Sequence, residues 1–61
     1  MTSQLEDNIV LMVKQGGGRL DGSLIAEFTK LCQDDFNYRP DTSCGKCIYK
    51  HALKLYFKYL Q

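Results

Sequence analysis

Three consecutive glycines at positions 16–18 constrain the fold of this chain more than any other feature. Glycine lacks a Cβ atom, so a run of three loses much backbone entropy in any helix or strand and adopts left-handed conformations freely. A regular element must therefore end before the run, and we interpret the run as a flexible turn between two helices. The alternative is a close approach of the backbone to a phosphate, but the lysine and hydroxyl of a nucleotide-binding loop do not follow.

The segment before the glycines has the pattern of an amphipathic helix. Ser3 and Glu6 form a capping box, in which the serine hydroxyl accepts from the amide three residues on and the glutamate reaches back. The apolar positions that follow, at intervals of three to four residues, are Leu5, Ile9, Met12 and Val13. This spacing places them on one helix face and predicts a helix over residues 4–15.

A second helix is predicted over residues 23–35. Asp21 or Ser23 can cap it, because short polar side chains satisfy the free amides of a first turn. The apolar positions that share one face of this helix are Leu24, Phe28, Leu31, Cys32 and Phe36. Pro40 then denies a backbone donor and biases the residue before it away from the helical region, so a turn follows.

A third helix is predicted over residues 43–59, capped by Thr42 or Ser43, since neither glycine nor proline occurs after Gly45. The sequence therefore predicts an all-α fold, a compact three-helix domain with a long basic C-terminal helix, and residues 1–61 form a single domain. A chain of 61 residues is near the lower limit for unaided folding. We expect a metal, a disulfide, a second copy or a larger assembly to contribute.

The charges are unevenly distributed along the chain. All seven acidic residues lie before Thr42, and the segment after it carries four lysines and no acid. These lysines, spaced four apart along one side of the third helix, are Lys46, Lys50, Lys54 and Lys58. The aromatic and apolar residues interleaved with them are Tyr49, Tyr56, Phe57 and Leu60. The combination favours binding to nucleic acid or to an acidic protein surface, and the alternative is a solvated face whose lysine stems cover apolar surface.

The third helix also carries more apolar side chains than two short helices can cover. Leu53, Phe57, Leu60 and the tyrosines surround the part of its circumference that does not face the core. An exposed patch of this kind usually meets a partner. We therefore expect a homo-oligomer or a subunit of a larger assembly.

Cysteine spacing suggests a metal site. Cys44 and Cys47 precede His51, and Cys32 lies upstream, which makes four ligands of the kind that tetrahedral zinc takes. On one regular helix Cys44 and His51 would lie about 10.5 Å apart along the axis, too far for a shared ion. One structural zinc would therefore require Cys44 in a non-helical knuckle before the helix, and the four residues are candidate ligands on that condition.

Three other interpretations of the cysteines stay open. They can pack as small hydrophobic residues. Cys44 and Cys47 can form a redox pair, since Cys-Gly-x-Cys resembles the active-site sequence of thioredoxins, although the βαβ pattern of that fold does not accompany it. A cysteine nucleophile activated by His51 would lack a third orienting group.

With one histidine, no interpretable acid and base pair and too little chain for an enclosed pocket, we expect no enzyme.

The location expected is the cytoplasm, with no membrane contact. The first thirteen residues lack a basic start followed by an apolar run and a small-residue cleavage site. No stretch approaches the ~20 apolar residues that a membrane span needs. The three cysteines are an odd number, which fits a reducing compartment.

One segment carries a distinctive run, Phe36-Asn37-Tyr38-Arg39-Pro40 followed by Ser43-Cys44-x-x-Cys47 at the start of the lysine-rich helix. Over roughly a third of the chain this looks like short uncharacterised proteins encoded by bacteriophages of gut bacteria. The resemblance implies a virion component or a small factor that acts on host or phage machinery in the host cell.

Two functional hypotheses follow. The first is a small non-catalytic binding module that acts on nucleic acid through its C-terminal helix. The alternative is a phage-type structural or regulatory protein-interaction subunit, either a virion component or an inhibitor of a host enzyme, stabilised by zinc.

Overall fold

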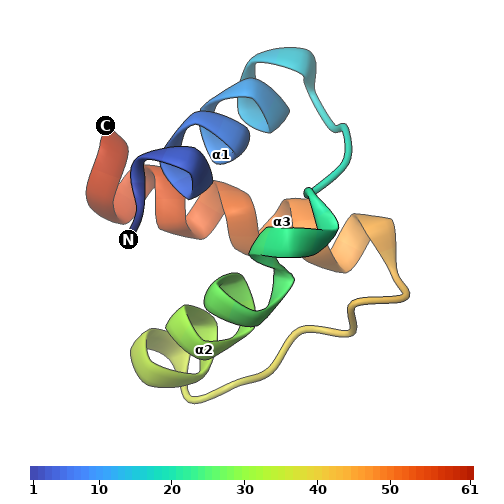
Figure 1. Cartoon of the computed structure of the whole chain (residues 1–61), viewed down its shortest axis with the longest axis vertical. Helices are drawn as coiled ribbons and strands as arrows, with labels where there is room; N and C mark the ends of the chain where they lie inside the picture. The colour runs from blue at the N-terminus through green and yellow to red at the C-terminus, as the bar shows by residue number, and fades with distance from the viewer.

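The computed structural model describes all 61 residues, and it contains three α-helices and no strands (Figure 1). The helices are α1 (Ser3–Gln15), α2 (Ile25–Phe36) and α3 (Gly45–Leu55). A short 3₁₀ turn, η1 (Gly22–Leu24), leads into α2, and a π-helical turn, η2 (Tyr56–Leu60), continues α3. The all-α three-helix prediction is confirmed.

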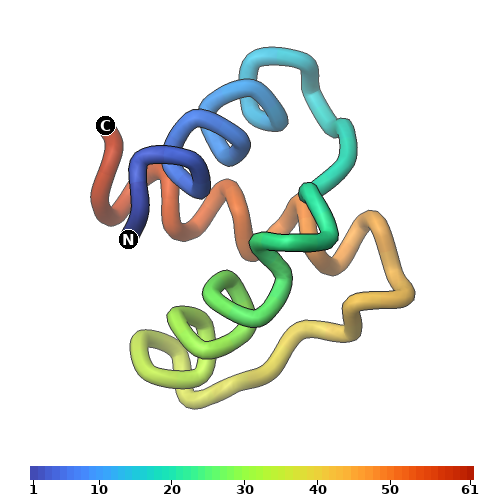
Figure 2. The backbone as a smooth tube through the Cα atoms, viewed as in Figure 1, coloured from blue at the N-terminus to red at the C-terminus, as the bar shows by residue number.

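The C-terminal helix is the central element of the arrangement. In Figure 1 α3 passes behind the other two helices, with α1 on one side of it and α2 on the other. α1 packs along both α3 and η2. The backbone trace in Figure 2 shows the two chain ends close together, and the connection from α2 to α3 follows the edge of the molecule. Because α3 lies between two helices, one of its faces is buried and the other is left for solvent.

The core is one cluster of ten buried apolar residues contributed by every helix. Its members are Leu5, Ile9, Met12, Leu20, Leu24, Phe28, Cys32, Ile48, Ala52 and Leu55. Most lie on the three-to-four-residue spacing of the sequence, which puts them on one face of each helix. Phe28 is the largest fully buried side chain. Burying a side chain of this kind stabilises the fold by about 1.5–3 kcal/mol, so the cluster holds the helices together.

The start of α1 differs from the prediction, because Thr2 and not Ser3 is the N-cap. The Thr2 hydroxyl oxygen accepts from the amide of Leu5 at 3.3 Å. Thr2 also donates its backbone N–H and its hydroxyl to the carboxylate of Glu27, at 2.8 and 2.9 Å. A glutamate from α2 thus takes the place of the one in a local capping box. This contact with α2 selects Thr2 as the N-cap, and a pattern of neighbouring residues in the sequence cannot predict it.

The two later helix starts use Asp21 and Cys44. Asp21 caps η1, since its carboxylate accepts from the N–H and the hydroxyl of Ser23, both at 3.1 Å. The prediction of Thr42 or Ser43 as the α3 cap is wrong, because Ser43 donates its N–H and hydroxyl to Asp41 instead, at 2.9 and 2.6 Å. These bonds hold the pKa of the Asp41 carboxyl below its usual value. The next residue, Cys44, is extended and becomes the cap.

The glycine turn takes backbone angles that other residues rarely adopt. Gly16, Gly17 and Gly18 have φ values of 69°, 151° and 116°. Gly16 ends α1 by donating its N–H to Val13, as a left-handed helix end does. The return of the chain is held by Asn8, which accepts from the N–H of Asp21 at 2.9 Å and donates to the carbonyl of residue 19 at 3.1 Å. These bonds therefore tie the chain to α1 just after the glycine turn.

Two leucines on α1 provide a matched test of this packing. Leu5 is fully buried, whereas Leu11 is 54% exposed. Leu5→Ala is expected to lower the free energy of unfolding by about 2–5 kcal/mol, through lost burial and the cavity left behind. Leu11→Ala should change it by less than about 0.5 kcal/mol. Urea unfolding followed by circular dichroism measures both, and equal losses would show that the core face of α1 is assigned wrongly.

Candidate functional site

The four lysines of the C-terminal helix form a line on the exposed side of α3 and η2, which we call the lysine ridge: Lys46, Lys50, Lys54 and Lys58. A spacing of four residues advances about 40° beyond a full turn, so the line drifts around the helix. At one end Lys46 lies beside the glycine turn. At the other end Lys58 reaches α2. The ridge therefore crosses the molecule obliquely.

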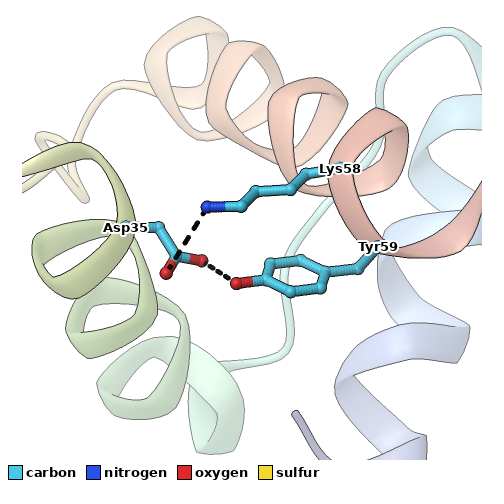
Figure 3. A network of polar contacts seen from close by, with 3 residues as sticks. All are labelled: Asp35, Lys58 and Tyr59. Carbon is cyan, nitrogen blue, oxygen red and sulfur yellow. Dashed lines mark hydrogen bonds and ion pairs between the residues drawn. The ribbon is translucent and has the colours of Figure 1, made fainter.

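The lysine at the C-terminal end of the ridge is engaged by α2. The ammonium of Lys58 lies 3.7 Å from a carboxylate oxygen of Asp35, and the hydroxyl of Tyr59 donates to the other oxygen (Figure 3). An exposed ion pair of this kind contributes about 0–1 kcal/mol, so it mainly orients the side chains. Lys58 is the one ridge lysine with a carboxylate partner. Lys46, Lys50 and Lys54 are the cations left for a ligand.

The residues predicted to bind a partner beside the lysines divide into two groups. Phe57 is 58% exposed, whereas Tyr49, Tyr56 and Leu60 are half-buried against the core. Tyr38, which is 54% exposed in the α2–α3 connection, was not among the predicted binding residues. Tyr38 is the single aromatic residue between α2 and α3, which was the only signal for it.

Tyr59 is exposed although it lies close to the core in the sequence. It follows the buried Leu55 by four residues, a spacing that keeps two side chains on nearly the same face of a regular α-helix, but it is 48% exposed. The π-helical turn η2 has wider hydrogen bonding than an α-helix, which rotates the residues after Leu55 relative to the core. Its hydroxyl bond to Asp35 then fixes the ring at the surface.

An open pocket of about 280 Å³ lies beside the middle of the ridge, and we call it the aromatic pocket. It is lined by Phe36, Tyr38, Cys47, Lys50, His51 and Lys54. Tyr38 stacks on His51, with ring centres 5.2 Å apart and planes 7° from parallel. The ammonium of Lys54 lies 5.7 Å from the centre of the Phe36 ring. The pocket thus combines aromatic surfaces with two lysines, which suits a flat or anionic ligand.

His51 is positioned by packing and by the backbone. It is buried, and its Nδ1–H donates to the carbonyl of Cys47 at 2.8 Å. This bond and the Tyr38 ring fix the imidazole. Because Nδ1 of His51 is bonded to the Cys47 carbonyl and not to a thiol, the geometry gives no support to activation of a cysteine through this nitrogen.

The three cysteines occupy two different environments. Cys32 is fully buried in the core, and this burial raises the pKa of its thiol to about 11, which makes it unreactive. Cys44 and Cys47 lie together at the start of α3 with their sulfurs 2.7 Å apart. The Cys47 thiol and backbone N–H both donate to the Cys44 sulfur, which lowers the pKa of Cys44 and raises the pKa of Cys47.

The four candidate zinc ligands are only partly brought together. Cys44 has the extended backbone that the zinc hypothesis required, and it pairs with Cys47. Cys32 lies in the core and Nδ1 of His51 is turned to a carbonyl. No group of three or more histidine, cysteine or acidic side chains is close enough to hold a metal ion. Zinc binding stays a prediction.

None of the helices has the length and apolar character needed to cross a bilayer. No known protein family, curated protein or solved structure matches the chain. A functional proposal therefore depends on the residues of α3 and of the elements around it.

The contact between Asp35 and Tyr59 predicts a titration that can be followed by absorbance. The bond to the Asp35 carboxylate raises the pKa of the Tyr59 phenol. A raised pKa means that the contact stabilises the fold below the ordinary tyrosine value and is lost as pH rises through the raised value. Ultraviolet titration should therefore show one late tyrosinate component. Tyr59→Phe should remove it and Asp35→Asn should shift it down. Asp34 is the exposed neighbour of Asp35, so Asp34→Asn is the control. An equal shift with this substitution would contradict the contact between Asp35 and Tyr59.

Proposed function

We propose that the chain is a non-catalytic binding module that holds single-stranded nucleic acid along its lysine ridge. One observation carries this proposal: three exposed lysines without carboxylate partners, Lys46, Lys50 and Lys54, lie in line beside exposed aromatic rings. Proteins that bind single strands combine a positive track for phosphates with aromatic side chains on which bases stack.

The charge distribution supports a polyanionic ligand. The three free lysines are spaced about 6 Å apart along the axis of α3, so they present a row of cations rather than one point charge. The segment from Thr42 to the C-terminus contains no acid. Asp35, the acid nearest the C-terminal end of the ridge, is already engaged by Lys58 and Tyr59. The phosphate backbone of a nucleic acid therefore meets little repulsion from acidic side chains along the ridge.

The exposed aromatic residues supply surface for unpaired bases. Tyr38 and Phe57 are each more than half exposed, and Tyr59 is nearly so. One face of Tyr38 stacks on His51, which holds the ring in place, and the residue is still 54% exposed to a ligand. Stacking of a base on such a ring contributes about 1–3 kcal/mol and tolerates any base. Binding with little sequence preference follows from these contacts.

A protein partner is the second candidate, favoured by the exposure of Phe57. This ring is 58% exposed at the end of the C-terminal helix and contacts Tyr56 edge-on. Large exposed rings are frequent anchors of protein interfaces. The partner would be a second copy or an acidic protein surface, as in a virion subunit or an inhibitor of a host enzyme. In this case apolar contact, and not the lysines, would dominate the affinity.

Salt dependence tests the nucleic-acid proposal. Affinity for a fluorescent single-stranded oligonucleotide of mixed sequence, measured by anisotropy, should fall linearly with salt on logarithmic axes. Lys50→Gln with Lys54→Gln should weaken binding and reduce this slope by about 1.4, since each phosphate contact on a single strand contributes about 0.7. The control pair, Lys14→Gln with Lys30→Gln, removes the same charge from exposed lysines of α1 and α2 and should leave the slope nearly unchanged.

Two results would count against this proposal. An affinity that does not change with salt would exclude phosphate contacts. A stable dimer in sedimentation experiments that Phe57→Ser dissociates, while the ridge substitutions leave it intact, would establish the protein-interaction alternative.

A further inference from the structure

The paired thiols at the start of α3 are a second chemical feature, and the proposed function makes no use of them. The sulfurs of Cys44 and Cys47 are 2.7 Å apart, and both residues are free cysteines. A disulfide bond is about 2.05 Å long, so the two sulfurs are about 0.65 Å further apart than in a disulfide. Both side chains are half-buried and not enclosed in the core, so a small reagent can reach them. Distance and access together mark the pair as a dithiol that can be oxidised.

The two cysteines have different positions, which gives them different parts in the chemistry. Cys44 precedes the helix in an extended conformation, and its sulfur accepts from the N–H of Cys47 at 3.3 Å and from the Cys47 thiol. These donors and the amides at the start of an 11-residue helix favour a negative charge on the Cys44 sulfur. Cys47 acts as donor and keeps its proton. Cys44 is therefore the attacking thiol, and Cys47 is the thiol that resolves an adduct on it.

We propose that Cys44 is a site of S-thiolation by small anionic disulfides and that Cys47 converts the adduct to an intramolecular disulfide. The Cys44 thiolate attacks one sulfur of the disulfide, which forms a mixed disulfide and releases one thiolate. Cys47 then loses its proton to solvent and attacks the Cys44 sulfur, releasing the second thiolate. One disulfide is reduced to two thiols, and the protein dithiol is oxidised to one disulfide. The exchange is stoichiometric, one small disulfide for each chain.

The surroundings of the pair favour an anionic reagent. Cys47 lines the aromatic pocket together with Lys50 and Lys54, whose ammonium groups are exposed. Lys46 lies between the two cysteines in the sequence. Asp41 is the one acid whose negative charge acts on both thiols, where it opposes the loss of a proton from each. The carboxylates of a peptide disulfide such as glutathione disulfide would pair with the lysines, whereas a cationic disulfide would be repelled.

Cys32 provides an internal control. It is fully buried between the helices, so a reagent reaches it only when the protein unfolds. Its reaction would report loss of structure and not chemistry at the start of α3. The chain therefore contains one cysteine whose labelling shows whether the fold stays intact during the experiment.

The test is reaction of the reduced protein with glutathione disulfide, followed by acid quenching, alkylation and mass spectrometry of the intact chain and of its peptides. The wild type and Cys32→Ser are expected to become two hydrogens lighter, with the bond between Cys44 and Cys47. Cys47→Ser should stop at a stable glutathione adduct on Cys44. Cys44→Ser should form an adduct on Cys47 at least roughly tenfold more slowly, because the activated thiol is missing. Serine caps helices well, so the last variant keeps its fold.

A comparison of the reaction rates of small disulfides with different charges tests the proposed substrate class. Glutathione disulfide should react faster than the cationic disulfide cystamine. Lys50→Gln with Lys54→Gln should slow the reaction with glutathione disulfide more than the reaction with the neutral disulfide of 2-mercaptoethanol. The ratio of the two rates removes any general change in thiol reactivity.

Specific results would overturn the proposal. Equal reaction rates for Cys44→Ser and Cys47→Ser, or a wild-type adduct that never closes, would refute the assigned parts of the two cysteines. Faster reaction with cystamine would refute the anionic substrate class. Because this test contains no nucleic acid, its failure leaves the proposed ridge function untouched.

Discussion

Burial of one face of α3 against the other two helices is the interaction on which the rest of the structure depends. Ile48, Ala52 and Leu55 from this helix enter the same core cluster as Phe28 of α2 and Ile9 of α1. Without a central helix covered on two sides, a chain of this size would bury too little apolar surface to fold. The same burial determines which side of α3 faces solvent, and the lysine ridge lies on that side. The buried face and the candidate binding surface therefore lie on opposite sides of α3.

Polar contacts between elements then adjust how this core is joined. The hydrogen bonds from Thr2 to Glu27 connect the start of α1 to α2, and those of Asn8 fasten the chain as it leaves the glycine turn. Asp35 ties the end of α2 to η2 through Lys58 and Tyr59. Each contact is exposed and contributes modestly by itself. Their effect is on geometry, because they determine which helix ends meet and which lysine of the ridge is neutralised.

The start of α3 shows how one group can serve both structure and chemistry. The Cys44 sulfur accepts a hydrogen bond from a first-turn N–H, as the side-chain oxygen does when serine is the N-cap. The donors at this helix start also stabilise a negative charge on the sulfur. Cys47 is close enough to resolve an adduct, and it lines the pocket that Lys50 and Lys54 share with the ridge. The proposed redox site and the proposed binding surface are therefore adjacent, with common cations between them.

The helices and most of the core could be predicted from the amino-acid sequence, because they follow from local rules. Glycines at 16–18 and Pro40 separate the helices, and apolar spacing alone identifies the core faces that contain Leu5, Phe28 and Cys32. Regular spacing likewise placed the lysines in one line. Other features depend on contacts between residues distant in the chain: the choice of Thr2 as a cap, the exposed position of Tyr59, the stacking of Tyr38 on His51 and the pairing of Lys58. At each of these positions local preferences leave several nearly equal arrangements, and a contact between elements selects one of them.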